Sequence, residues 1–501
     1  GRESLMAFLY YGADWDFETI QRVHDAIEEI ALGDLGLDLY PNQIEIISSE
    51  QMLDAYSSHG MPLMYRHWSF GKLFAREETL YRTGLQGLAY EIVINSNPCI
   101  SYLMEDNTMT MQALVIAHAA FGHNHFFKNN YLFKQWTDAE AILDYLNFAK
   151  RYIAKCEDEY GFDAVEQVID SAHTLMNQSV FRYRRPPRRS EQQQEEKLRR
   201  RIAHERATFN DLWRTVPVTP TPTGKDDSAS DDDDERMKLP EENLLYFIEK
   251  HSPILRAWQA ELLRIVRTIA QYFYPQRQTK VMNEGCATFV HHHIMQELHR
   301  RGLISDGSFL EFLLRHSSVI FQPPFDSPHH SGINPYTLGF AMMTDIKRMC
   351  EEPTDEDRQW FPNLAGKVDW RLALKHAWAD FRDESFIQQY LSPKVMRDLR
   401  LFSLHDEAED PVYRVSAIHE ERGYRKIRSV LAASYDIGII DPNIQIVAAN
   451  LSGDRKLQLE YRPHRCVPLD ELQKSKVLAH VHMLWGYDVE LQSLSEDSDA
   501  A

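Results

Sequence analysis

The stretch that decides the fold is Thr108-Met-Thr-Met-Gln-Ala-Leu-Val-Ile-Ala-His118-Ala-Ala-Phe-Gly-His123-Asn-His125. Thr108 is a suitable N-cap, and the apolar residues after it predict a hydrophobic helix over 108–122. A second helix is predicted over 281–301, which contains Met282-Asn-Glu-Gly-Cys-Ala-Thr-Phe-Val-His-His-His293. Polar side chains inside apolar runs must satisfy one another, so we expect these two helices to pack side by side.

Histidine and carboxylate side chains recur in both helices, and they are the usual protein ligands of zinc and iron. Glu284 and His291 lie seven residues apart, which is two helical turns and therefore one face. His118 and His123 lie five apart; an unbroken helix would separate them by about 140°, and Gly122 offers a break that brings them together. We predict that these four side chains hold Zn²⁺ or another divalent transition metal. The alternative is that they are helix-packing polar residues that hydrogen-bond to one another.

The template for such a site is the metalloprotease helix, H-E-x-x-H, completed by a glutamate from a second helix. In that motif the glutamate after the first histidine is the general base. Here the same position is Ala119, so the ligands of a hydrolase are present while its expected base is absent. A hydrolase would need a base from elsewhere. Glu91, in an upstream strand, and Glu105 are candidates because they are near in sequence.

The composition is that of an acidic globular chain. Its 501 residues include 55 Lys+Arg and 75 Asp+Glu, a net charge of −20, which argues against nucleic-acid binding through a globally basic surface. The five cysteines form no C-x-x-C pair, which favours a reducing compartment over a disulfide scaffold. No apolar run reaches the ~18 residues that a membrane helix needs, and no secretory signal is recognisable. We therefore expect a protein of a reducing compartment without a membrane-spanning helix.

We predict a mainly helical α+β protein with short β segments, whose N-terminal and central helices form a gluzincin-like metal-site arrangement. In the last hundred residues the expected order is β-α-β-β-α-β, the split βαβ of a ferredoxin-like unit. We predict four segments. Residues 1–216 form an α-rich N-terminal domain with short strands, and residues 217–238 form an acidic linker or insertion. Residues 239–400 form a helical part that packs on the N-terminal domain, and residues 401–501 form a C-terminal α+β domain.

A basic stretch at 182–206 precedes the acidic linker. It includes Arg184, Arg185, Arg188 and Arg189, which flank Pro186-Pro187. Clustered guanidinium groups are typical of a docking patch for an acidic partner or a phosphate ligand. The alternative is a solvated helix with an exposed turn.

Longer motifs make a family resemblance visible, and they include Tyr40-Pro-Asn-Gln-Ile-Glu, His67-Trp-Ser-Phe-Gly-Lys72, Met282-Asn-Glu-Gly and Ser331-Gly-Ile-Asn-Pro-Tyr-Thr-Leu-Gly-Phe340. Over almost its whole length the chain resembles the bacterial stage V sporulation protein R (SpoVR) family. With His67, the motif residues Asn283, Asn334 and Tyr336 are expected to line the metal-site cleft. Two places depart from the family pattern. Cys286 stands where tryptophan is usual, and His125 and His292 look like local substitutions, so they are weaker ligand candidates.

The resemblance implies a bacterial cytoplasmic protein. In spore formers the family is tied to spore cortex formation. In other bacteria it travels with a PrkA-like AAA+ serine kinase and a von Willebrand factor A-type protein in stress physiology. No catalytic activity is attached to the family, and two hypotheses stay open. One is a regulatory or docking module with a structural or vestigial metal site, which Ala119 favours. The other is a gluzincin-like metallohydrolase acting on a peptide or cell-wall amide, which the clustered His/Glu pairs favour.

Deleting residues 219–235 of the predicted linker should leave the melting temperature nearly unchanged. The stretch is almost without apolar side chains, and loop closure costs only ~0.6 kcal/mol for each doubling of loop length. Thermal unfolding of the parent and of the deletion variant, followed by circular dichroism, measures the difference. A large fall in melting temperature would show that the stretch contributes packing.

Overall fold

The computed structural model describes residues 7–57, 64–65, 67, 91–181, 239–325, 327–328, 330, 332–405, 414–417, 419–463 and 469–494. Contacts divide the chain into two compact units. Unit 1 consists of Gly1–Asn177 and Ile254–Asp441, and unit 2 consists of Gln178–Pro253 and Pro442–Ala501. The four segments expected from the sequence, with borders at 216, 238 and 400, stay predictions. The predicted linker and the arginines at 184, 185, 188 and 189 lie outside the described residues.

Unit 1, the larger of the two, is mainly helical. Its N-terminal part contains α1 Phe17–Gly33, β1 Asn42–Ile47, α2 Ser49–Ser57, β2 Glu91–Ile94, β3 Cys99–Met104, α4 Met109–Val115, η1 Ile116–His123, α5 Asn124–Asn129, α6 Tyr131–Trp136, α7 Ile142–Tyr160 and α8 Phe162–Thr174. The short 3-10 turn η2, Met176–Gln178, follows at the border of the unit.

The second part of unit 1 continues the same helical core. It contains α12 Ala257–Gln278, α13 Lys280–Arg300, α14 Asp306–Val319, α15 Pro335–Glu351, α16 Asp355–Trp360, α17 Trp370–Asp380, α18 Asp383–Tyr390, α19 Pro393–Asp398, β4 Ser403–His405, β5 Arg414–Ala417, α20 Glu421–Ala433 and α21 Ile437–Ile440. The mainly helical class with short strands is therefore confirmed.

A small mixed sheet in the order β1-β3-β2 lies against η1. Strand β1 runs parallel to β3, and β2 runs antiparallel to it, with Glu91 opposite Leu103. The upstream strand that was expected to contain Glu91 is thus β2. Because Glu91 is the first residue of β2, the sheet brings a carboxylate towards the helical segment that carries the histidines.

The predicted helix over 108–122 begins where the sequence indicates, since the Thr108 hydroxyl accepts the Met111 N–H at 3.2 Å. From Ile116 to His123, however, it is a π-helix, in which residue i bonds to residue i+5. Residues five apart therefore return to the same side. The expected break at Gly122 was wrong, because the helix runs through this position and into α5.

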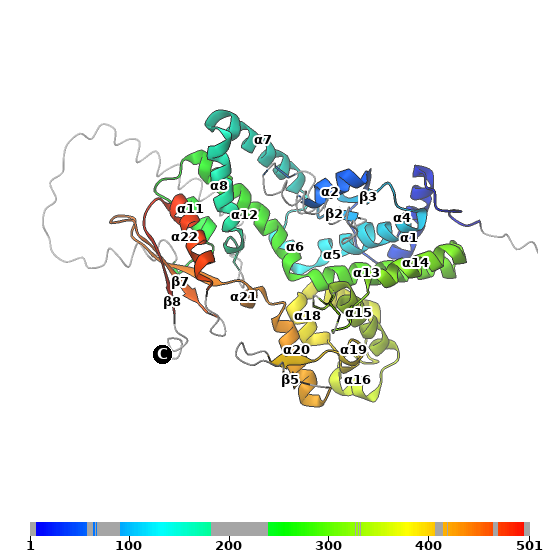
Figure 1. Ribbon diagram of the computed structural model, residues 1–501. Helices are drawn as coiled ribbons and strands as arrows, with labels where there is room; N and C mark the ends of the chain where they lie inside the picture. The colour runs from blue at the N-terminus through cyan, green and yellow to red at the C-terminus, as the bar shows by residue number, and fades with distance from the viewer. Residues whose placement is uncertain are drawn as a thin grey trace, which may run out of the picture. The chain divides into compact units, whose positions relative to one another are not determined.

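Helix α13 lies between η1 and α15, and glycines allow both to approach it closely (Figure 1). A Cβ on Gly122 of η1 would stand 2.5 Å from the Ala287 Cα atom of α13. On the other side, a Cβ on Gly285 would stand 2.6 Å from the Gly339 Cα atom of α15. The expected side-by-side packing of the two ligand-bearing helices is confirmed, and it is backbone against backbone.

Unit 2 is built from α11 Leu244–His251, β6 Asn443–Ala449, β7 Leu457–Arg462, α22 Glu471–Trp485 and β8 Val489–Ser493. Its sheet has the order β6-β7-β8, with β6 antiparallel and β8 parallel to β7. Trp485 of α22 is fully buried and stacks on Phe247 of α11, with ring centroids 5.9 Å apart. A bridge between Glu241 and Ile446 ties the start of the unit to β6.

The described strands do not form the expected ferredoxin-like βαββαβ arrangement. Strand β5 pairs with β4 in a separate two-stranded sheet of unit 1, which leaves three strands in the C-terminal sheet. The cause is α20, which follows β5. It buries Tyr424 and Ile427 in the large core of unit 1, so the strand beside it stays with that unit.

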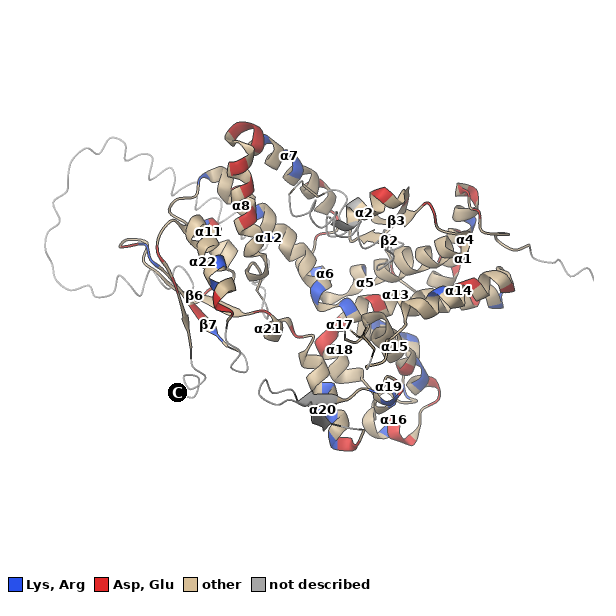
Figure 2. Ribbon diagram, in the orientation of Figure 1, with Lys and Arg blue, Asp and Glu red and all other residues tan. Residues whose placement is uncertain are grey.

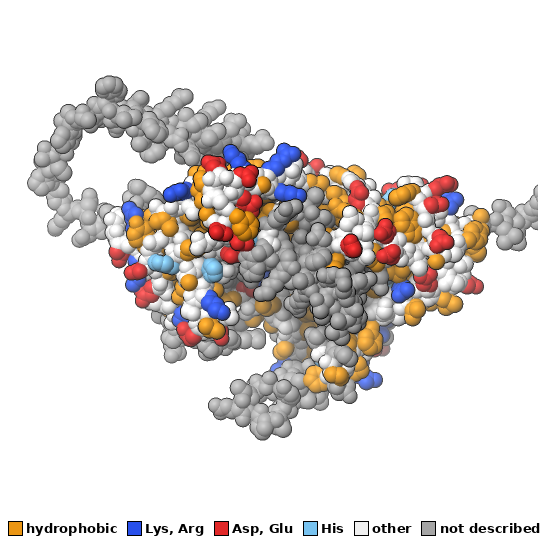
Figure 3. Space-filling view, turned by 45° about the horizontal axis from the view of Figure 1, so that its top comes forward, with side chains coloured by type: hydrophobic (Ala, Val, Ile, Leu, Met, Phe, Trp, Pro, Cys, Tyr) orange, Lys and Arg blue, Asp and Glu red, His pale blue; other side chains and the backbone are white. Residues whose placement is uncertain are grey.

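Charges of both signs are interspersed in the described residues. Figure 2 shows Lys and Arg beside Asp and Glu along α14 and α16, and acidic residues gathered where α7 meets α8. The face in Figure 3 likewise mixes charged and hydrophobic side chains. Among the described helices, none combines the length and apolar character needed to cross a membrane.

The substitution Gly339→Ala should destabilise unit 1 strongly. Its Cβ would collide with the Val281 carbonyl oxygen and come within 2.6 Å of the Gly285 Cα atom, so α13 and α15 would have to separate. Overpacking of this kind costs about 1–3 kcal/mol or more. Urea unfolding measures the loss. Gly307→Ala in α14 is the matched control, because its Cβ would meet only Ser305 Oγ at 3.8 Å. Equal stability of the two variants would contradict the close-packing argument.

Candidate metal centre

Four side chains from three elements turn their donor atoms towards one another. Glu91 comes from β2, His118 and His123 from η1, and Glu284 from α13. The His118 Nε2 atom lies 3.1 Å from Glu91 Oε1 and 3.7 Å from Glu284 Oε2. The His123 Nε2 atom lies 3.9 Å and 3.4 Å from the same two oxygens. The π-helical turn sets the two rings at 83° with centroids 4.8 Å apart.

These spacings suit a small cation. Zn²⁺ bonds to histidine and carboxylate are ~2.0–2.2 Å long, so ligand atoms at the corners of a tetrahedron lie roughly 3.3–3.6 Å apart. The four nitrogen–oxygen distances, from 3.1 to 3.9 Å, bracket that range. The nearest ligand atoms of Glu91, His118 and His123 all lie within 4.8 Å of one another.

The outer nitrogen of each imidazole has a partner of its own. Asn283 Oδ1 accepts the His123 Nδ1–H at 2.8 Å, and His118 Nδ1 lies 2.8 Å from His291 Nδ1. Metal-ligating histidines almost always use the second ring nitrogen in this way, because the outer hydrogen bond fixes the tautomer and the ring orientation. The inner Nε2 atoms are thereby directed at the two carboxylates.

Two carboxylate oxygens in the cluster lack hydrogen bonds. The Glu91 and Glu284 side chains are only 19% and 18% exposed, and the Oε2 atom of each is buried without a hydrogen-bond partner among the described residues. An unpaired buried acceptor is costly, and a carboxylate more so than a neutral group. A bound cation would satisfy both oxygens.

The pKa values reflect the crowding of charge. Burial raises the pKa of Glu91. Burial also opposes ionisation of Glu284, but the nearby imidazoles of His123 and His118 outweigh it and hold the pKa of that carboxyl well below its usual range. Burial would lower the pKa of His123, whereas Glu284 and Glu91 raise it to about 9. A proton on His123 therefore takes the role of the cation, and a metal ion would replace it.

The family follows from comparison with known proteins. A family model described as SpoVR like protein matches residues 14–440, and one described as SpoVR-like C-terminal domain matches residues 442–496. The chain belongs to the SpoVR-like family. It is 54% identical over 486 residues to the uncharacterized protein YcgB of Escherichia coli (strain K12), covering 97% of this chain and 94% of that relative. No solved structure matches the chain. The two matched ranges meet at one of the borders between the units, after Asp441, while Gln178–Pro253 of unit 2 lies inside the first range.

The α13 segment of this SpoVR-like chain is held in place from α18. Both carboxylate oxygens of Asp383 accept backbone N–H groups of the first turn, from Val281 at 2.9 Å and from Met282 at 2.8 Å. The carboxylate is 1% exposed, and burial raises its pKa to about 7 although the backbone hydrogen bonds favour its ionised form. Asp383 thus fixes the turn that immediately precedes Asn283 and Glu284.

The structure places the predicted ligand His291 one layer behind the cluster. It is fully buried, and both of its ring nitrogens are engaged: Nδ1 faces His118, and Nε2 lies 2.9 Å from His316 Nδ1. The two candidates for the general base, Glu91 and Glu105, lie in different places. Glu91 lies in the cluster, whereas Glu105 is exposed in the turn after β3.

The residues expected to line a cleft go to different places. Asn283 holds His123, and the Tyr336 ring lies over His118 with centroids 6.2 Å apart. His67 instead pairs with Asp170 of α8 at 2.8 Å. Asn334 caps α15 by accepting the Tyr336 N–H. Only Asn283 and Tyr336 are therefore brought to the cluster.

The two histidines treated as weaker candidates lie away from the carboxylates. His125 Nδ1 accepts the Asp38 N–H at 3.0 Å, and His292 packs against the His316 ring. Two residues connected to the cluster by hydrogen bonds through α13 were not found from the sequence. His316 stands alone in α14 without a motif, and Asp383 acts through backbone N–H groups, which leave no pattern of spacing.

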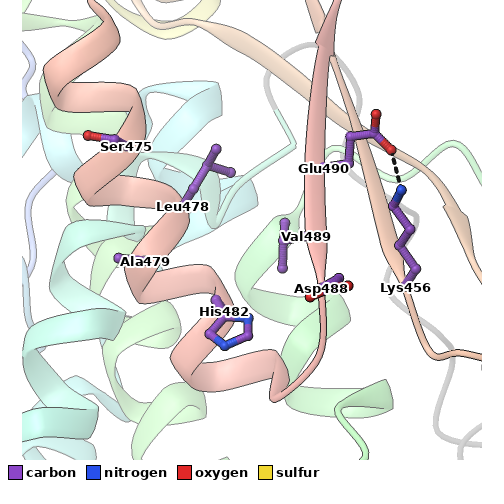
Figure 4. A pocket seen from close by; sticks show the side chains of 8 residues that line it. All are labelled: Lys456, Ser475, Leu478, Ala479, His482, Asp488, Val489 and Glu490. Atoms are coloured by element: carbon purple, nitrogen blue, oxygen red, sulfur yellow. Dashed lines mark ion pairs between the residues drawn. The ribbon is translucent and has the colours of Figure 1, made fainter.

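Apart from the metal centre, a concavity lies in unit 2, between α22 and β8 (Figure 4). It holds about 470 Å³ and is lined by Ser475, Leu478 and His482 of the helix and by Val489 and Glu490 of the strand. Its charged groups include Lys456 and Glu490, which pair with each other at 2.6 Å. This groove shows no group of converging ligand atoms like the one at the metal centre.

Acid should destabilise the folded chain through buried histidines. Burial is the main cause that lowers the pKa of His316 to about 3, and of His292 and His293 to about 4. Unfolding restores an ordinary pKa of ~6.5, so the unfolded chain binds more protons between about pH 4 and 6.5. The free energy of unfolding should fall as the pH decreases through this window, by about 1.4 kcal/mol per pH unit for each histidine.

Urea unfolding between about pH 5 and 7 measures this slope. In the His316→Phe variant the slope of the unfolding free energy against pH should be smaller by about 1.4 kcal/mol per pH unit, because one titrating ring is removed. His376→Gln is the control, since that ring and its partner Asp380 are both exposed in the folded chain. Equal slopes in the parent and in His316→Phe would contradict the assignment.

Proposed function

We propose that this chain binds one divalent transition metal ion, preferably Zn²⁺, at His118, His123 and Glu284, with Glu91 beside it as the base, and uses the ion to hydrolyse a peptide or cell-wall amide. One observation carries the proposal. The Nε2 atom of each of the two imidazoles lies 3.1–3.9 Å from oxygens of both Glu91 and Glu284, while the outer nitrogens of both rings are held by other side chains. A packing cluster would have no need of two buried carboxylates with unpaired oxygens.

The arrangement supports hydrolysis because it offers a base. A bound divalent ion would supply Lewis-acid activation of a carbonyl and of water. His118, His123 and Glu284 repeat the gluzincin pattern of two histidines on one helical segment and a glutamate on a second. Glu91 is then the additional carboxylate, and burial moves its pKa towards neutrality, which suits a group that accepts and returns a proton. It would compensate for Ala119.

A second proposal is favoured by Ala119 itself. In this proposal the metal is structural, and the chain is a cytoplasmic regulatory module that docks to a PrkA-like AAA+ serine kinase and a von Willebrand factor A-type protein. Ala119 is fully buried in η1 and cannot supply a base. A structural metal would contribute its binding free energy to folding. The resemblance to the family supports these partners.

Protein purified without a His tag should bind one equivalent of Zn²⁺ per chain, measured by elemental analysis and titration calorimetry. Glu284→Gln should weaken binding by at least about tenfold, because replacing even an outer-sphere partner costs ~10–100-fold in metal affinity. Glu105→Gln is the matched control, since Glu105 is exposed and outside the cluster. If the parent chain does not bind Zn²⁺, both proposals are wrong.

The two proposals separate on the loaded protein. For a hydrolase, fluorescently labelled casein or purified peptidoglycan should be cleaved. Chelation and Glu91→Gln should each abolish turnover, and Zn²⁺ should restore the chelated parent. For a docking module, the same assays should stay negative while Glu284→Gln lowers the melting temperature of the metal-loaded chain. Cleavage that persists in Glu91→Gln would remove Glu91 from the role of base.

A further inference from the structure

A line of three buried histidines leads away from the candidate metal centre. His118 of η1 meets His291 of α13 through their Nδ1 atoms at 2.8 Å. The Nε2 atom of His291 then meets Nδ1 of His316, on α14, at 2.9 Å. The exposed fractions of the three residues are 4%, 0% and 4%. Three elements are thus joined by one continuous hydrogen-bonded chain of imidazoles.

Each link in this chain holds one hydrogen atom between two nitrogens. A neutral imidazole has one N–H donor and one acceptor, so fixing the tautomer of one ring fixes the other two. The rings of His291 and His316 are buried, and the hydrogen bonds that link them and His118 join imidazoles alone, so we take both rings as neutral. Only two arrangements remain, and they run in opposite directions.

In the first arrangement the hydrogen bonds point towards the centre. His316 donates from Nδ1 to His291, His291 donates from Nδ1 to His118, and His118 carries its hydrogen on Nε2. That atom faces Glu91 Oε1 at 3.1 Å, so the arrangement suits a centre without a metal ion. In the second arrangement His118 donates from Nδ1, which leaves the Nε2 lone pair free for a cation.

We propose that metal binding reverses the direction of the whole histidine chain, so that the ring of His316 changes tautomer when the centre is filled. This inference rests on the proposed metal site. Atoms balance: the Nε2 proton of His118 leaves at the centre, one hydrogen shifts across each of the two links, and His316 Nε2 takes up one proton from water. Each ring ends with one hydrogen, as it began.

His291 and His316 are therefore positioning residues for His118. They accept the hydrogen that the ligating tautomer must place on Nδ1, and they carry the state of the centre from η1 to α14. At the far end His316 changes from an acceptor to a donor at Nε2. Its ring packs against His292 and Phe340, with centroids 4.7 and 4.8 Å away. The change in hydrogen bonding at His316 Nε2 therefore occurs where α13, α14 and α15 meet.

Nitrogen NMR on the full chain with ¹⁵N-labelled histidine tests the reversal directly, because protonated and unprotonated ring nitrogens resonate far apart. Adding Zn²⁺ should exchange the Nδ1 and Nε2 signals of His291 and His316, neither of which touches the ion. Variants that lack each histidine assign the signals. Changes confined to His118 and His123 would overturn the inference while leaving the metal site intact.

Zn²⁺ affinity gives a second, independent readout. His316→Phe keeps an aromatic ring but removes the Nδ1 acceptor at the end of the histidine chain. It should weaken Zn²⁺ binding by ~10–100-fold, as loss of outer-shell partners does. His316→Asn places an amide near the Nδ1 position and should restore most of the affinity. His292→Phe is the matched control, because that ring packs against His316 outside the hydrogen-bonded chain.

The outcomes are distinguishable. Equal affinity of His316→Phe and His292→Phe, or failure of His316→Asn to rescue, would show that His316 acts through packing alone. If the phenylalanine variant does not fold, the spectra of the parent still decide. A parent chain that binds no Zn²⁺ would overturn the proposed function, and the reversal with it.

Discussion

The close contact between Gly122 and Ala287 is the constraint on which the centre depends. Because neither backbone carries a large side chain there, η1 and α13 approach until a Cβ on Gly122 would stand 2.5 Å from the neighbouring Cα atom. At that separation a glutamate on one helix reaches two histidines on the other. A wider spacing, of the kind that leucines would impose, would leave Glu284 too far from the rings for both to share one small ion.

The rest of unit 1 supports this contact. Helix α15 presses on the opposite side of α13 through Gly339, and Asp383 holds the first turn of α13 by two backbone hydrogen bonds. The small sheet adds Glu91 from a third direction. The candidate metal site is thus built on three elements of secondary structure, which is what a centre with fixed ligand geometry requires. In the histidine chain, a fourth element, α14, is coupled to the same point.

Much of this could be predicted from the sequence, because the deciding signals are local. Thr108 marks the start of a helix, and polar residues such as His118 and Glu284 inside apolar runs indicate that two helices face each other. The π-helix could not be predicted, since η1 has the composition of an ordinary buried helix and differs only in its hydrogen bonding. Nor could the pairing of β5, because the amphipathic pattern of α20 shows that it buries a face but not which core receives it.

The π-helical turn also bears on how such centres are recognised. A π turn takes one residue more than an α turn, so His118 and His123 stand to each other as the two histidines of H-E-x-x-H do, with a single residue added between them. The added residue lies within η1, and α4 and α5 flank it on either side. Pattern searches that fix the interval at four residues will pass over relatives of this kind, and ligand pairs at an interval of five deserve the same inspection wherever small residues line the turn.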